Sequence, residues 1–180
     1  MNATAPMARY FVGLGSNLGD RLATLRAAAT ELAALAQVTL AAHSSVWETR
    51  PLGPGADAFL NAAVELHTAL PAADLLAHML GIERGHGRVR RERWGDRTLD
   101  LDLLCGFGPN GRELSIAAPN LTLPHPELSR RDFVLQPLLD MDPLLRVHGR
   151  RCAELLAALE PSQRTLLRRL PAPLVELTRP

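Results

Sequence analysis

Apolar and polar positions alternate along most of this chain in patterns that predict short strands and helices. Runs of apolar or alternating residues bounded by turn residues are typical of strands. Apolar residues spaced three and four apart, in stretches that prolines open or glycines close, predict helices. We expect strands at 9–14, 38–48, 58–68 and 99–104, with shorter ones at 113–117 and 144–147. We expect helices at 22–35, 71–83, 133–139, 152–159 and 162–170.

This order of elements, βαββαβ with additions, predicts the α+β class with a ferredoxin-like core, a mainly antiparallel sheet flanked by helices. A chain of 180 residues is long enough for one domain with a full hydrophobic core. We expect the domain to cover 1–150, and 151–180 to be a C-terminal helical extension packed on it or trailing it.

The stretch GRVRRERWGDRTLDLDLL, residues 87–104, carries the most chemical information. Asp100 and Asp102 are two positions apart in an apolar run, so both carboxylates should leave one face of a strand, and the leucines around them the other. Two adjacent carboxylates are stable together when a cation lies between them. Mg²⁺ suits such a pair because it takes one or two carboxylates and completes its shell with substrate phosphates.

An arginine-rich loop precedes this strand, with Arg88, Arg90, Arg91, Arg93 and Arg97 in ten residues. Guanidinium groups pair bidentately with phosphate oxygens, so the loop is suited to a polyphosphate. The alternative is structural: the acids would face solvent on an edge strand and the arginines would form a basic surface loop. Because the arginines outnumber the acids near them, we favour a Mg-nucleotide site, with the loop as a lid that closes on substrates.

Composition narrows the function classes. All 20 basic residues are arginines, which excludes a P-loop lysine and a lysine nucleophile. The first alternative to a Mg-nucleotide enzyme is an α+β module that binds nucleic acid. The net charge of +1 and the aromatic content of 4% argue against it. The second alternative is a metal-dependent phosphohydrolase, in which His125 would activate water.

The remaining signals concern location and local structure. Cys105 and Cys152 fit no metal spacing and predict reduced thiols. Neither a signal peptide nor an apolar run long enough to span a membrane is present, so we expect a cytoplasmic protein. The GSNLGD cluster predicts a tight turn into a helix capped by Asn17 or Asp20, with a phosphate loop as the weaker interpretation. Asn61 is either a satisfied core amide or a reader of a heterocycle edge.

Four blocks in order extend the interpretation: GLGSNLGDR, TRPLGPGADAFLNAAV, GRVRRERWGDRTLDLDLL and LTLPHPELSRRDFVLQPL. From about Tyr10 to about Leu145 the chain resembles the 6-hydroxymethyl-7,8-dihydropterin pyrophosphokinases of folate biosynthesis. The resemblance implies transfer of diphosphate from ATP to the hydroxymethyl group of the pterin, release of AMP and a need for two Mg²⁺ ions. We expect ATP and the pterin as partners, neither nucleic acid nor membrane, and a monomer or weak homodimer.

The resemblance also implies roles for single residues. The metal ligands would be Asp100 and Asp102. The catalytic arginines would be Arg88, Arg90, Arg93 and Arg97. ATP would be bound by Glu83, Arg88, Trp94, Arg97, Leu103, Thr122, His125 and Arg131. The pterin would be bound by Thr49, Leu52, Gly53, Phe59, Asn61, Trp94 and Phe133, with the two phenylalanines on either side of its ring. The chain departs from the family pattern at Arg50, Leu80, Asn120 and Pro126, and Arg50 replaces a proline that would stiffen the pterin loop.

Overall fold

The computed structural model describes residues 6–51, 57–87 and 98–175. Seven of the predicted site residues lie outside these ranges: Leu52, Gly53, Arg88, Arg90, Arg93, Trp94 and Arg97. The predicted lid falls there as well.

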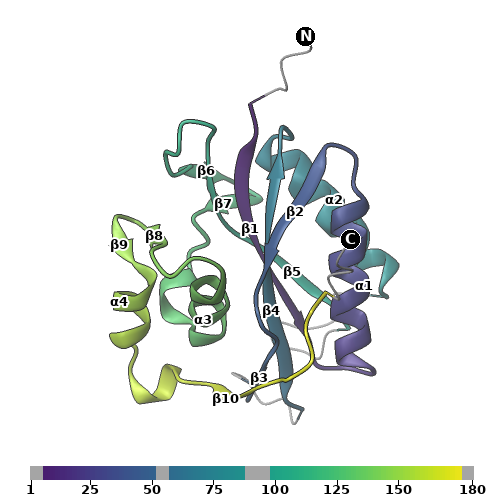
Figure 1. Ribbon diagram of the computed structural model, residues 1–180, viewed down its shortest axis with the longest axis vertical. Helices are drawn as coiled ribbons and strands as arrows, with labels where there is room; N and C mark the ends of the chain where they lie inside the picture. The colour runs from purple at the N-terminus through teal and green to yellow at the C-terminus, as the bar shows by residue number, and fades with distance from the viewer. Residues whose placement is uncertain (1–5, 52–56, 88–97, 176–180) are drawn as a thin grey trace.

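A six-stranded antiparallel sheet forms the centre of the molecule, with the order β10-β3-β4-β1-β5 and β2 paired with β4 (Figure 1). Its strands are β1 (Ala8–Ser16), β2 (Val38–His43), β3 (Trp47–Thr49), β4 (Phe59–Thr68), β5 (Asp100–Phe107) and β10 (Leu166–Arg169). The helices are α1 (Arg21–Ala34), α2 (Ala72–Gly85), α3 (Asp132–Met141) and α4 (Cys152–Ala157). Two small hairpins, β6 (Ile116–Ala118) with β7 (Leu121–Leu123) and β8 (Arg146–Val147) with β9 (Arg150–Arg151), complete the strands. The predicted α+β class and ferredoxin-like βαββαβ order are confirmed.

The sheet separates two apolar cores, because alternate residues of each strand point to opposite faces. Val12, Leu14 and Leu103 pack under α1 and α2. Phe11 and Cys105 pack on the other face with α3 and α4. Figure 1 shows α1 and α2 on one side of the sheet and α3 and α4 on the other. Leu104 belongs to this second core, so the prediction that all the leucines around the aspartates share one face was wrong. A bulge between Phe11 and Val12 shifts the register at this point.

The predicted strand 38–48 is two strands in the structure. β2 pairs with the second half of β4 and β3 with its first half. The chain bends between them at Ser44, whose hydroxyl donates to the carbonyl of Ser45 and accepts the N–H of Ala63. A side chain that bonds neighbouring backbone in this way interrupts the regular ladder.

The helix predicted at 162–170 was wrong, since only a single 3₁₀ turn at Pro161–Gln163 is helical there. Residues Leu166–Arg169 form β10, which pairs with the outer edge of β3. An unpaired strand edge offers a row of backbone donors and acceptors, and here the C-terminal segment of the chain satisfies them. The predicted strand 113–117 is also displaced, because regular pairing begins at Ile116 and only an isolated bridge joins Glu113 to Phe107.

Candidate active site

Three neighbouring strands bring the central residues of the candidate site into one row. Gly15 on β1 is paired with Asn61 on β4 and, on its other side, with Asp100 on β5. One step along β1, Gly13 is paired with Asp102. Because paired residues of an antiparallel sheet project from the same face, the amide and the two carboxylates lie on one surface, separated by the glycine strand.

The glycines leave room where any side chain would intrude. A Cβ atom on Gly15 would lie 3.1 Å from Asn61 Oδ1 and 3.9 Å from Asp100 Cβ. The space between the amide and the carboxylates is therefore open only because Gly15 has no side chain. Both aspartates are half-buried, and they are hard oxygen ligands of the kind Mg²⁺ takes. Among the described residues no cluster of three or more His, Cys, Asp or Glu could hold a metal, so the pair fits Mg²⁺ with water or phosphate oxygens completing the shell.

Glu83 on α2 fixes the strand that carries the aspartates. Its Oε1 accepts the backbone N–H of Leu101 at 2.8 Å, between Asp100 and Asp102. β5 is an edge strand, so this N–H faces away from β1 and needs a partner outside the sheet. Glu83 is 2% exposed. Its position suits a residue that holds the metal pair in place better than one that contacts ATP directly.

Asn61 and Thr49 are joined on the other side of the row. Asn61 Nδ2 donates to Thr49 Oγ1 at 2.7 Å, in a buried hydrogen bond between β4 and β3. This bond fixes the orientation of the amide. Its Oδ1 is directed at Gly15, 3.1 Å from the point where a Cβ atom would lie if residue 15 had a side chain. Phe59 is paired with Thr49 at the start of β4 and is half-buried. The structure thus brings three of the predicted pterin residues together.

Arg131 and Phe133 flank the first residue of α3. The Arg131 guanidinium lies over the Phe133 ring, 5.7 Å from its centroid, and both residues are half-buried. The structure shows no contact between the rings of Phe59 and Phe133, so their sandwich around a pterin stays a prediction.

His125 follows the extended segment after β7. Its backbone N–H donates to the carbonyl oxygen of Leu104 on β5, and its ring Nδ1 accepts a hydrogen bond from the backbone N–H of Glu127 at 3.1 Å. A ring nitrogen that accepts leaves the proton on the other nitrogen when the ring is neutral, so Nε2–H is the donor available to a ligand.

Two other predicted ATP residues are less favourably placed. Leu103 packs in the core beneath α1 and α2, on the face opposite the aspartates, so its side chain points away from them. Thr122 is exposed on β7, where it is paired with Ala117.

Hydrogen bonds between charged side chains hold β3, the strand that leads into the predicted pterin loop. Glu48 accepts from Arg168 at 2.7 Å and from Arg21 at 3.2 Å, and Arg21 also donates to the carbonyl of Ala58 at 2.6 Å. The hydrogen bond from Arg168 lowers the pKa of Glu48 despite its burial, and Arg21 adds to the effect. Residues 17–20 form a turn between β1 and α1, and Asp20 rather than Asn17 caps α1.

The sequence interpretation missed three residues that shape this region. Gly13 and Gly15 alternate on β1, and glycines at strand spacing signal a close approach by another group. Asp132 is buried at the start of α3 and binds the C-terminal segment. No local sequence pattern predicts this role of Asp132, because its partners are 33 and 34 residues away in sequence.

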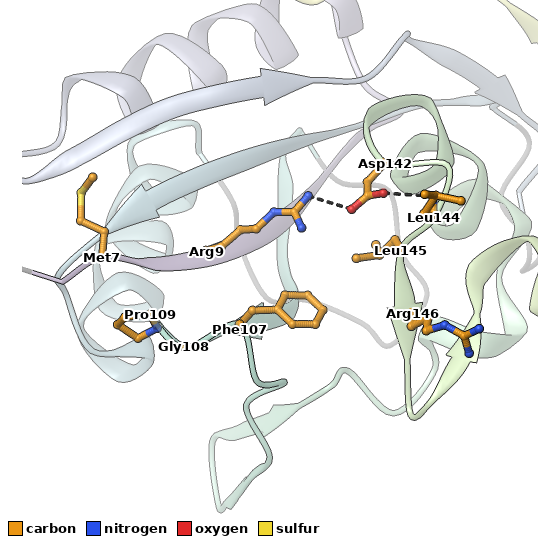
Figure 2. A pocket seen from close by; sticks show the side chains of 10 residues that line it. Met7, Arg9, Phe107, Gly108, Pro109, Asp142, Leu144, Leu145 and Arg146 are labelled. Atoms are coloured by element: carbon orange, nitrogen blue, oxygen red, sulfur yellow. Dashed lines mark hydrogen bonds and ion pairs between the residues drawn. The ribbon is translucent and has the colours of Figure 1, made fainter.

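A pocket of about 370 Å³ lies at the opposite end of the sheet and contains none of the predicted site residues (Figure 2). Arg9 reaches into it and is held by Glu65 at 2.7 Å and Asp142 at 3.0 Å, with its guanidinium 4.5 Å from the centroid of Phe11. Because Arg9 is already paired with two carboxylates and stacked on a ring, we assign this pocket no ligand.

Comparisons with known proteins give matches over most of the chain. The sequence profile described as 7,8-dihydro-6-hydroxymethylpterin-pyrophosphokinase (HPPK) matches residues 11–143. The 2-amino-4-hydroxy-6-hydroxymethyldihydropteridine pyrophosphokinase of Methylorubrum extorquens is 41% identical over 87% of this chain and 96% of its own length. The Pseudomonas aeruginosa protein of that name is 43% identical over 83% of this chain and 91% of its own.

Solved structures support the fold. A structure titled HPPK-DHPS in complex with substrates superposes with a TM-score of 0.63 at 11% identity, over 86% of this chain. A Plasmodium falciparum HPPK-DHPS superposes with a TM-score of 0.60 at 14% identity, over 84%. This chain spans 43% of each of those longer chains.

No helix among the described residues is long and apolar enough to cross a membrane.

Proposed function

Since this chain belongs to the 7,8-dihydro-6-hydroxymethylpterin-pyrophosphokinase family and has its activity in folate biosynthesis, we propose here which residues carry that activity. The observation on which the proposal rests is the row Asn61, Gly15, Asp100 across three strands. The amide would bind the pterin edge, and the carboxylates would bind the metal ions of ATP. The open space above Gly15 is where the pterin hydroxymethyl group and the β-phosphate would meet.

The reaction needs no protein nucleophile. The hydroxyl oxygen of 6-hydroxymethyl-7,8-dihydropterin forms a bond to the β-phosphorus of ATP, and the bond from that phosphorus to the oxygen shared with the α-phosphate breaks. AMP leaves with that oxygen, and the hydroxyl proton passes to solvent. Catalysis of such a transfer consists mainly of positioning and charge neutralisation.

Asp100 and Asp102 would hold two Mg²⁺ ions, which would neutralise phosphate charge when bound. Glu83 would keep the aspartate strand in place through the N–H of Leu101. His125 Nε2–H and the Arg131 guanidinium are suitable donors to the triphosphate oxygens. The arginines of 88–97 would complete the charge neutralisation, and their roles depend on the sequence resemblance alone.

On the pterin side, Asn61 would present Oδ1 to the heterocycle while its Nδ2 stays bonded to Thr49. Phe59 and Phe133 would stack on the flat ring, each contributing about 0.5–1.5 kcal/mol beyond area burial. Backbone groups around Leu52 and Gly53 would read the remaining edge.

We place the enzyme in the cytoplasm as a monomer or weak homodimer. Both cysteines are free and buried, as expected in a reducing compartment. Sedimentation of the purified protein at several concentrations would measure its state of association.

The direct test is AMP release from ATP and Mg²⁺ with and without 6-hydroxymethyl-7,8-dihydropterin. We expect AMP only when the pterin is present, in equal amount to the pterin diphosphate. A metal-dependent phosphohydrolase would instead release product from ATP alone, and that result would contradict the proposal.

A further inference from the structure

The C-terminal strand joins the two sides of the candidate pterin site. One side is β3 and β4, with Thr49 and Asn61, and the other is the start of α3, with Arg131 and Phe133. Between them runs the segment from Arg164 to Leu166, which enters β10 (Figure 1). The family profile ends at residue 143, so this segment lies outside the matched region.

A buried carboxylate links α3 to this segment. Asp132 accepts hydrogen bonds from Thr165 Oγ1 at 2.6 Å, from the N–H of Leu166 at 2.9 Å and from the N–H of Thr165. Asp132 and Thr165 are each 1% exposed. Three donors converge on one carboxylate away from water, so the carboxylate cannot move without leaving buried polar groups unsatisfied.

The same segment is bonded to β3 on its other side. Leu166 is paired with Thr49, and the N–H of Arg50 donates to the carbonyl of Thr165 at 3.0 Å. The Arg50 side chain donates to the carbonyl of Arg164 at 2.6 Å. A proline at position 50 could not donate its N–H, so this departure from the family pattern adds a bond between the residue after β3 and the C-terminal segment.

We propose that Asp132 and Thr165 are positioning residues that hold the two walls of the pterin site at a fixed separation through the C-terminal strand. The chain of contacts runs from Asp132 to Thr165 and Leu166, from Leu166 to its paired residue Thr49, and from Thr49 Oγ1 to Asn61. Phe133 follows Asp132 directly on α3. Neither residue touches substrate in this scheme. The inference rests on the proposed function, because it takes Asn61 and Phe133 as pterin contacts.

Thr165→Val tests the junction because valine keeps the shape of threonine but leaves Asp132 Oδ1 without its hydroxyl donor. We expect the Kd for the pterin, measured by calorimetry with Mg²⁺ and a non-hydrolysable ATP analogue, to rise about tenfold, because binding would then have to order two walls that the wild-type protein holds in place. The KM for the pterin should rise with it, kcat should change less, and the Kd of the ATP analogue should stay within about threefold. Thr165→Ser should restore pterin binding.

Thr68→Val is the matched control. Thr68 is fully buried at the far end of β4, and its hydroxyl accepts the N–H of Leu70 at 3.0 Å. This variant should lose comparable stability while its pterin affinity stays that of the wild type. A folded Thr165→Val protein with pterin affinity within twofold of wild type would overturn the proposal.

Hydrogen exchange on the wild-type protein gives a second measurement that does not depend on the folding of a variant. If the walls are coupled, pterin binding should slow exchange over 165–169 as well as at Thr49 and Asn61, since coupling between sites is reciprocal. Protection confined to Thr49 and Asn61 would overturn the proposal. Failure of the proposed function would show separately, as absence of pterin binding and AMP release in the wild-type enzyme.

Discussion

Gly15 lies between two side chains that the candidate site needs, Asn61 on β4 and Asp100 on β5. At the scale of single residues, the absence of a side chain there matters as much as the amide and the carboxylate beside it. Motifs and the strand period predicted roles for Asn61 and Asp100, but no local pattern indicated that the two side chains are neighbours. Their adjacency depends on the register of three strands that are far apart in sequence.

The first prediction concerns this glycine. Gly15→Ala puts a methyl group 3.1 Å from Asn61 Oδ1, and Asn61 cannot turn away without losing its bond to Thr49. We expect the KM for the pterin to rise by about tenfold or more, the effect of roughly 1.4 kcal/mol. Steady-state kinetics would measure it, with Gly81→Ala on α2 as a control, since a Cβ atom there would make only an ordinary contact of 3.8 Å with Arg84 Nη2. Equal KM values for the two variants would contradict the prediction.

The second prediction concerns the metal pair. Asp102→Asn keeps the shape of the side chain but removes a charge and a strong ligand. Turnover should fall roughly 10²–10⁴-fold, corresponding to about 3–5 kcal/mol of lost transition-state stabilisation. Pterin binding should persist, and excess Mg²⁺ or Mn²⁺ should restore activity only in part. The control is Asp74→Asn on the exposed first turn of α2. A rate within about threefold of wild type would reject the assignment of Asp102 as a metal ligand.

At the scale of elements, local pattern predicted β1, β4, α1 and α2, because each has apolar positions at its own period over many residues. It failed for β10. The sequence LLRR suits a helix face, and it becomes a strand because the edge of β3 and the carboxylate of Asp132 are available to it. The role of Glu83 likewise depends on a contact between distant elements. It was recognised as an acid of the ATP region, but its bond to the edge of β5 depends on how α2 packs against the sheet.

The third prediction concerns that bond. Glu83→Ala leaves the N–H of Leu101 buried without this acceptor, which should lower the free energy of unfolding by roughly 1–3 kcal/mol. The strand bearing the aspartates should also become less well fixed, so the Mg²⁺ concentration for half-maximal turnover should rise. Glu83→Gln retains an acceptor oxygen and should lie close to wild type in both properties. If the alanine variant had the Mg²⁺ requirement of the wild type, the positioning role of Glu83 would be wrong.

At the scale of the whole molecule, the end of the sheet opposite the site is held by a charged network. Arg9 on β1 binds Glu65 on β4 and Asp142 after α3. Burial alone would raise the pKa of Glu65, but hydrogen bonds from Arg9 and His67 outweigh it and lower the pKa below its ordinary value of 4.5. The network joins both central strands to the layer that contains α3, and the sequence did not predict it because its members are up to 133 residues apart.

The fourth prediction is the pH dependence of stability. A lowered folded-state pKa means that the stability contributed by Glu65 is fully present above about pH 4.5 and is lost as pH falls through the folded value. Glu65→Gln should cost roughly 1–3 kcal/mol at neutral pH. Its urea midpoint should then fall less steeply than that of the wild type as the solution is acidified below about pH 4.5. Parallel curves for the two proteins would contradict this assignment.

The position of β10 in the sheet has a consequence for the newly made chain. Residues 165–169 leave the ribosome after every other described strand and helix of the molecule. Until then β3 has an open edge and Asp132 has none of its three donors from this segment, so a nascent chain exposes a strand to which another chain can add. Completion of the proposed pterin site therefore waits for this last described strand, and a chain cut short near residue 160 would lack the segment that pairs with β3 and binds Asp132.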